Sequence, residues 1–233
     1  MKFIRHAAFA AAAAILSSPA VAADGAFTQE EIASQFDIAF GAAVTSRYIS
    51  RGADNSDGVA LQAYIEPSYG IFYAGIWAST VDGNILGSPG DNAEIDFYAG
   101  IRPEFGSLAL DLGYARYVYD DSGDCCGEFY AKATYTFTEQ FSAGGEIYHD
   151  PENDTTYGVL NAAVVLPYDI TLSAAYGEWL ESGNDDRDWN IGLSYTIDDT
   201  FTIDGRYHDS NFDHGRFVVT LSVDSSWSAL RGK

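Results

Sequence analysis

The chain has 233 residues, of which 34 are acidic and 12 are basic, so its formal net charge is −22 at pH 7. This excess of carboxylates excludes nucleic-acid binding by counterion release, which requires Lys and Arg side chains. Two cysteines are too few for a disulfide framework. Tyr and Gly are abundant instead, as expected for antiparallel strands.

The N-terminus predicts a secretory signal peptide at residues 1–22. Lys2 and Arg5 form a basic region, residues 7–16 are apolar, and Ala20-Val21-Ala22 is a small-residue cleavage site. A membrane-anchor helix needs about 20 apolar residues, and this apolar run ends at Ser17. We therefore expect cleavage after Ala22 and export of the mature chain.

Residues 23–35 follow as a segment of different character. Thr28 and Glu31 have the spacing of a weak capping box, which indicates a short helix. Three interpretations stay open: a periplasmic extension, a small plug and a disordered N-terminus.

From Phe36 onward, apolar and polar residues alternate with a period of two, which predicts β-strands. Between Glu94 and Tyr119 one parity is apolar, while the other carries carboxylates and Arg102 in mid-strand. A strand that is apolar on one face and charged in the middle of the other indicates lipid outside and water inside. The expected strands, about twelve in number and near the length of a tilted membrane strand, span residues 36–48, 59–67, 70–81, 93–103, 108–119, 127–137, 141–149, 155–166, 170–178, 188–197, 201–209 and 215–223.

The connections between these strands alternate between short and long. The short joins lie at 67–69, 104–107, 138–140, 167–169 and 198–200. The long joins lie at 50–58, 82–92, 120–126, 150–154, 179–187 and 210–214. Outer-membrane barrels have short periplasmic turns and longer outer loops, whereas a β-sandwich has no reason to keep this asymmetry.

Charged residues on the polar parity are the candidate pore-lining residues. They are Glu94, Asp96, Arg102, Asp111, Glu128, Lys132, Glu146, Asp204 and Arg206. Rings of side chains set the ion preference of pores, and acids outnumber bases at these positions. The alternative is that the charges pair across strands in a narrow, nearly filled barrel and only stabilise it. Small residues on the same parity, such as Gly113 and Ala115, favour a narrow pore.

The long joins are rich in Asp and Glu. The spacing of Asp120, Asp121 and Asp124 offers oxygen ligands for a hard cation such as Ca²⁺. No join has the full twelve-residue calcium pattern, so solvated acidic loops are the favoured interpretation and no metal site is assigned. Cys125 and Cys126 are adjacent, and a vicinal disulfide or a thiol metal site could form there; a disulfide would close only a tight local ring.

Little in the sequence indicates catalysis. A hydrolase needs a nucleophile, a base and an orienting group within hydrogen-bond reach. The candidates are His149-Asp150 and His208-Asp209-Ser210, but neighbours on a strand point to opposite faces. We expect no enzyme and no cofactor.

Three segments carry a family resemblance: residues 36–57, residues 70–82 and residues 93–101. Their marks are Ser46-Arg47-Tyr48 with Arg51-Gly52, a Gly-x-Tyr/Phe-x-Gly-x-Trp strand, and Glu94-x-Asp96-x-Tyr98. The chain resembles the TorF family of porins, Gcw_chp-type exported proteins of outer-membrane barrel fold, from Phe36 to about Val223. The resemblance implies a porin role. The family looks as though it ends on a terminal aromatic, whereas here Trp227 lies within a ten-residue tail.

These observations predict an all-β protein: a transmembrane, antiparallel, up-and-down β-barrel of about 12 strands at 36–223, followed by a tail at 224–233. We expect a narrow, acidic, modestly cation-preferring porin of the bacterial outer membrane. The alternative is a closed structural or binding barrel that acts through acidic surface loops, without transport. The expected partners are outer-membrane lipid, small ions or solutes and the barrel assembly machinery, with an oligomer left open and no nucleic acid.

Overall fold

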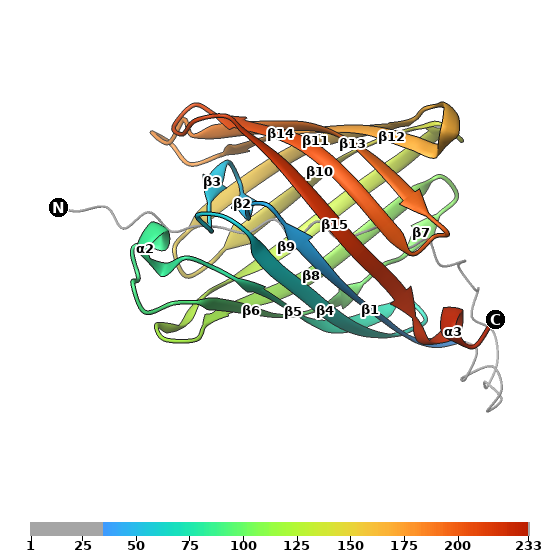
Figure 1. Cartoon of the computed structure of the whole chain (residues 1–233), viewed down its shortest axis with the longest axis horizontal. Helices are drawn as coiled ribbons and strands as arrows, with labels where there is room; N and C mark the ends of the chain where they lie inside the picture. Colours follow the sequence, from blue (N-terminus) through green and yellow to red (C-terminus); the bar gives the residue numbers. More distant parts are fainter. Residues whose placement is uncertain (1–34, 233) are drawn as a thin grey trace.

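A computed structural model describes residues 35–232 as one closed antiparallel barrel (Figure 1). The predicted twelve-strand architecture is confirmed. The long strands are β1 (Phe36–Thr45), β4 (Ala60–Tyr69), β5 (Phe72–Thr80), β6 (Ala93–Ile101), β8 (Leu108–Tyr119), β9 (Gly123–Thr138), β10 (Phe141–Asp150), β11 (Thr155–Val165), β12 (Ile170–Trp179), β13 (Arg187–Ile197), β14 (Phe201–Ser210) and β15 (Arg216–Ser226). Each of these strands pairs with the next, and pairing of β1 with β15 closes the barrel.

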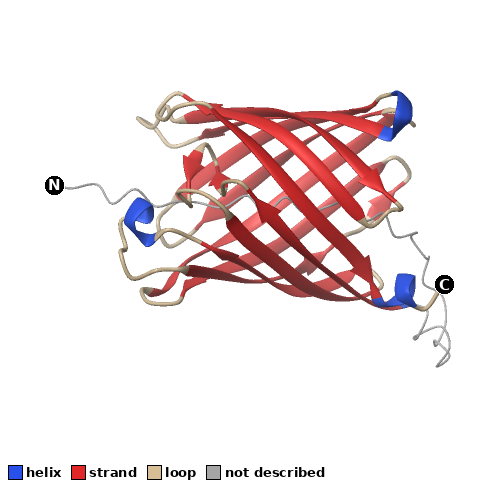
Figure 2. Cartoon of the chain, in the orientation of Figure 1, coloured by secondary structure: helices blue, strands red, loops and turns tan. Residues whose placement is uncertain are grey.

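Several short elements lie at the ends of the barrel (Figure 2). They are β2 (Ile49–Ser50), β3 (Ala53–Asp54), α2 (Gly83–Leu86), β7 (Glu104–Phe105), η1 (Pro167–Asp169) and α3 (Trp227–Leu230). Within residues 35–232, no helix has the length and apolar character needed to cross a membrane. The expected signal peptide, and all of the segment 23–35 except Gln35, lie outside the described residues.

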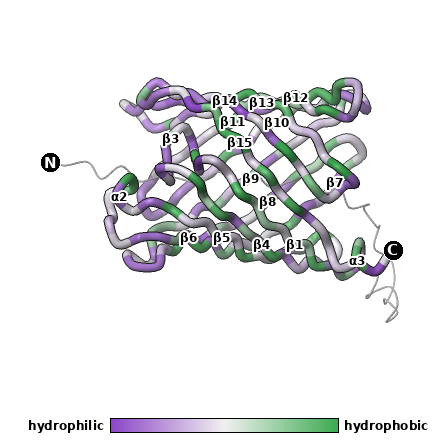
Figure 3. Tube along the Cα trace, viewed as in Figure 1, coloured by the Kyte–Doolittle hydropathy of each residue, from purple (hydrophilic) through white to green (hydrophobic). Residues whose placement is uncertain are grey.

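The period-two pattern sorts the side chains between the outside and the inside of the barrel, and Figure 3 shows hydropathy alternating along the strands. On β6, Phe97 is 48% exposed on the outer face, whereas Asp96 is 4% exposed on the inner face. The buried hydrophobic cluster lies inside the barrel around Tyr48, Tyr117 and Tyr119. The core of this protein is therefore the lumen, and its outer surface is apolar.

The two ends of the barrel differ. The chain enters β1 and leaves β15 at one end, the short-turn end, where α3 also lies; α2 and the longer connections lie at the other, the long-loop end (Figure 1). The expected long join at 120–126 is wrong, because β9 already begins at Gly123. Tyr119 pairs with Gly123, and a register shift between Tyr117 and Val118 places a bulge next to Cys126. Aspartates and a glycine there form a tight hairpin turn rather than a loop.

The C-terminal segment continues the last strand further than expected. β15 runs to Ser226, and the Ser226 hydroxyl then caps α3 by accepting a hydrogen bond from the Ala229 N–H. The Ser228 N–H donates to the Asp37 carboxylate at 2.9 Å, and the Ser228 hydroxyl also donates to it. The end of the barrel domain is thus tied to the first strand.

Candidate functional site

The first long loop, residues 46–59, folds into the barrel as the hairpin β2–β3. Its tip, Arg51-Gly52, has left-handed backbone angles, with φ of 47° and 75°. A Cβ on Gly52 would lie 2.6 Å from the Asp188 Cβ and 2.8 Å from the Ser210 Cβ, on strands β13 and β14. Because only a glycine permits this approach, the tip packs directly against the barrel wall at β13 and β14. The hairpin therefore folds into the lumen at the long-loop end.

Arg51 anchors the hairpin tip in the barrel wall. Its guanidinium donates two hydrogen bonds, of 2.8 and 2.7 Å, to the two carboxylate oxygens of Glu128 on β9. The side chains of this ion pair are 2% and 5% exposed. The guanidinium carbon also lies 4.8, 4.5 and 5.2 Å from the ring centroids of Tyr148, Tyr157 and Trp179. Bidentate pairing and aromatic stacking are what a planar guanidinium favours, so this is a specific docking site for Arg51.

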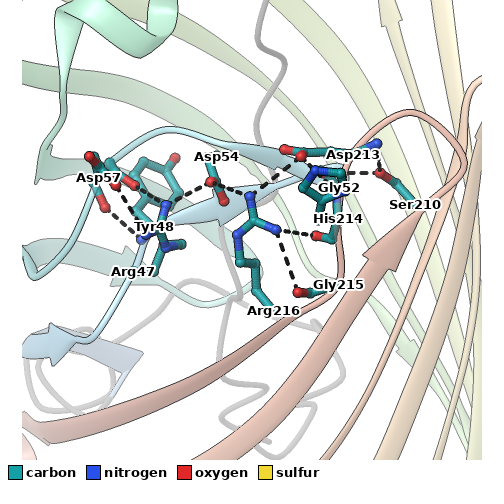
Figure 4. Close-up of polar contacts among 11 residues, drawn as sticks. Arg47, Tyr48, Gly52, Asp54, Asp57, Ser210, Asp213, His214, Gly215 and Arg216 are labelled. Carbon is teal, nitrogen blue, oxygen red and sulfur yellow. Dashed lines mark hydrogen bonds and ion pairs between the residues drawn. The ribbon is translucent and has the colours of Figure 1, made fainter.

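A second, more exposed set of ion pairs holds the base of the hairpin (Figure 4). Asp54 accepts from Arg47 at 2.7 Å and from Arg216 at 3.2 Å, which joins the hairpin to the start of β15. Arg47 also contacts Asp57, and Arg216 also contacts Asp213. These contacts fix the orientation in which the hairpin enters the lumen.

Three of the predicted pore-lining residues lie beneath the hairpin and not in an open channel. Glu94 is 0%, Asp96 4% and Glu128 4% exposed. Their inward direction agrees with the predicted parity. Because residues 50–58 are predicted from the sequence to be an outer loop, the burial of these carboxylates under that loop is not foreseen.

A cavity of about 290 Å³ lies inside the barrel, and its lining includes the charged residues Glu66, Asp96, Arg102, Asp111, Lys132 and Asp224. Arg102 pairs with Glu66 at 2.5 Å and with Asp111 at 3.3 Å, and its guanidinium carbon lies 3.7 Å from the Tyr73 ring centroid. The Lys132 ammonium lies 5.0 Å from the Tyr130 ring centroid. This cavity therefore collects charged groups of both signs.

The remaining predicted lining residues lie in mid-barrel. Arg206 pairs with Asp204 at 3.0 Å and donates to the Asn190 side chain at 2.7 Å. Glu146 accepts from the Asn161 amide at 2.8 Å and from the Tyr148 hydroxyl. The structure thus brings all nine predicted residues inside the barrel, and it places Asp111, Glu146 and Asp204 in hydrogen-bonded networks.

Arg51 and Asp188 were missed as lumen residues. Asp188 is 8% exposed and accepts a hydrogen bond of 2.5 Å from the Tyr157 hydroxyl. The signal that could have found Arg51 is the Arg-Gly pair inside an otherwise acidic loop, because a cation beside a turn glycine is suited to reach inward.

Several loop acids shape turns and are not simply solvated. Asp91 is 2% exposed and accepts from the Ser122 N–H at 2.8 Å and from the Ser122 hydroxyl at 2.7 Å. Asp120 accepts from the backbone N–H groups of Asn92 and Ala93, which holds the pKa of this carboxyl below its usual range. These contacts tie the second long-loop connection to the β8–β9 turn.

The structure joins Cys125 and Cys126 through a disulfide near the start of β9. Cys126 packs in the buried cluster with Tyr48 and Tyr117, at the base of the hairpin. Within residues 35–232, no three or more His, Cys, Asp or Glu side chains are grouped to hold a metal ion.

A family model described as "Bacterial protein of unknown function (Gcw_chp)" matches residues 29–229. The chain belongs to the Gcw_chp family. No curated protein sequence matches this Gcw_chp chain. Among solved structures, the "KdgM porin" is similar at 11% identity and a TM-score of 0.60, over 80% of this chain and 98% of that chain. The "NanC porin" is similar at 11% identity and a TM-score of 0.50, over 82% and 98%. At this level of identity the Gcw_chp chain and the two porins share a fold.

Proposed function

We propose that the chain is a porin of the bacterial outer membrane, as the TorF resemblance implies, with a narrow, acidic lumen that passes ions or small solutes and modestly prefers cations. The observation that carries the proposal is the lumen itself. It combines a charged cavity with a hairpin that narrows one end. A cavity lined by charged groups inside the barrel offers ions or small polar solutes space within the wall.

The outer face of the barrel supports a membrane location. Exposed apolar side chains surround it, including Leu61, Ile65, Phe72, Ile76, Phe97, Leu112, Phe129, Ile147, Leu160, Leu193, Phe201, Phe217 and Leu221. Soluble monomers rarely expose contiguous apolar patches of more than a few hundred Å², whereas outer-membrane barrels carry an apolar band towards lipid. In the orientation usual for such barrels, the short-turn end faces the periplasm and the long-loop end faces outward.

The charges in the lumen support a weak preference for cations. The acids are Glu66, Asp111, Glu146, Asp204 and Asp224, and the bases are Arg102, Lys132 and Arg206. Acids outnumber bases, and rings of acidic side chains favour cations in pores. Because several acids are paired with bases, the preference should be small.

Single-channel recording in a planar bilayer under a salt gradient tests this proposal. The wild-type barrel should give discrete current steps, with a reversal potential of the sign that indicates cation selectivity. The variant Asp111→Asn/Glu146→Gln/Asp204→Asn keeps side-chain shape and removes three of these charges, so its reversal potential should move towards zero. A matched control, Asp185→Asn/Asp198→Asn/Asp199→Asn, removes three exposed charges at the barrel ends and should leave the reversal potential nearly unchanged. Equal reversal potentials in the wild type and the lumen variant would contradict the cation preference.

A second candidate function is a closed barrel that binds or structures the surface through its outer loops. The buried Arg51–Glu128 pair favours it, because the hairpin is firmly docked across the lumen. In that case the folded barrel would be electrically silent, and deletion of the loops would abolish its function while leaving permeability unchanged. Under either function we propose a protein without enzymatic activity and without a cofactor, in contact with outer-membrane lipid and inserted by the barrel assembly machinery.

A further inference from the structure

Two buried carboxylates on β6 stand next to each other without a basic partner. Glu94 and Asp96 are two residues apart on one strand, so both side chains point into the barrel. Their carboxyl groups interact directly. Among the ion pairs of residues 35–232, none includes either residue, and neither Glu94 oxygen makes a hydrogen bond of standard geometry. Burying unpaired charge is expensive, so either a bound cation or protons must neutralise this pair.

The amide of Asn55, on the entering loop, lies at the same place. Asn55 is 0% exposed, and neither its Oδ1 nor its Nδ2 makes a hydrogen bond of standard geometry in the described chain. The Tyr48 hydroxyl interacts with both Asn55 and Glu94, which brings the amide to the carboxylate pair. The backbone holds Asn55 there: its N–H donates to the Tyr48 carbonyl, and its carbonyl accepts from the Asp82 N–H, both at 2.8 Å.

We propose that Glu94, Asp96 and Asn55 bind one hard divalent cation of the Ca²⁺ type. Two carboxylates balance its charge, and an amide oxygen adds a third ligand of the kind that Ca²⁺ prefers. Asp96 also lines the lumen cavity, which gives the ion a route to the site. The ion would join the entering loop to β6, which is separated from the Glu128 strand β9 only by β8. This site does not depend on whether the barrel conducts.

Calcium titration of the refolded mature barrel in detergent tests the site, with calorimetry for binding and thermal unfolding for stability. The wild type should bind Ca²⁺ at one tight site, and its unfolding midpoint should rise with Ca²⁺ concentration, because a ligand of the native state stabilises it. Glu94→Gln/Asp96→Asn preserves shape and should abolish both effects. Asn55→Leu keeps both charges and should weaken Ca²⁺ binding by more than about tenfold. Loss of a residue that only hydrogen-bonds to a metal ligand already weakens metal binding by about that factor.

Asp198→Asn/Asp199→Asn is the matched control. It removes the same charge from an exposed turn at the short-turn end, where both residues have positive φ values that Asn tolerates. This control should keep the calcium effect in full. The proposal is overturned if Ca²⁺ leaves the wild-type midpoint unchanged while pH moves it, since protons then neutralise the pair. It is equally overturned if the Glu94→Gln/Asp96→Asn variant still responds like the wild type, since the loops would then bind the ion.

Discussion

The Arg51 side chain makes the most specific contact in the lumen. Its guanidinium satisfies both oxygens of Glu128, which also accepts from the Tyr117 hydroxyl at 2.9 Å. Aromatic rings cover its faces. Since a buried ion pair often stabilises no more than apolar packing would, the value of this contact lies in fixing where the hairpin docks.

Arg51→Met should destabilise the barrel by about 3–5 kcal/mol, because it leaves the Glu128 carboxylate buried without its partner. Met keeps an unbranched side chain at the left-handed position. Adding Glu128→Gln removes the stranded charge and should recover part of the loss. Denaturant unfolding of the refolded barrel, followed by tryptophan fluorescence, measures both variants.

Arg116→Met is the control for this pair. Arg116 also makes ion pairs of 2.5 Å, with Asp124 and Glu152, but both partners are more than half exposed. Exposed pairs contribute little to stability, so the unfolding midpoint should barely change. An Arg51→Met barrel as stable as Arg116→Met would mean that the hairpin is not docked as described.

At the scale of single residues, the sequence predicted which way each side chain points but not how deeply it is buried. The parity rule placed Glu94, Asp96 and Glu128 inside the barrel, because side-chain direction depends only on the local pleat. Their burial depends on a loop that comes from elsewhere in the chain. Arg51 and Glu128 are 77 residues apart in the sequence, and nothing in either local pattern links them.

The strands are the elements that the sequence predicts best. Each holds an apolar face outward along its whole length, so the pattern is visible in the local sequence and the boundaries agree within a few residues. The β8–β9 turn was misread because Asp120, Asp121 and Gly123 resemble a loop. The hairpin β2–β3 was missed because strands of two residues leave no periodic signal.

The lipid contact that we propose along the strands leads to a prediction on β13. Leu193 and Ile197 are 50% and 40% exposed on the outer face, near the middle and at the short-turn end of the strand. Leu193→Arg should cost about 2–4 kcal/mol in lipid vesicles, and Ile197→Arg about 0–1 kcal/mol, because the penalty falls towards the membrane surface. Denaturant unfolding in vesicles gives both values. Equal costs at the two positions would contradict a membrane that surrounds this face.

At the scale of the whole molecule, the strands form a closed barrel wall and the lumen is partly filled. The hairpin from the first long loop occupies the long-loop end, and a charged cavity lies within the barrel. Barrels of this size stand between small filled barrels and wide porins. We therefore propose that the hairpin sets the width of the pore.

Replacement of residues 46–59 with a short Gly-rich turn tests that claim. Thr45 and Ala60 are paired across β1 and β4, so a tight hairpin can join them without disturbing the barrel. The measurement is unitary conductance in planar bilayers, for the wild type and the shortened variant side by side. We expect small discrete steps for the wild type and steps several-fold larger for the variant. Equal conductance, or silence from both folded proteins, would contradict it.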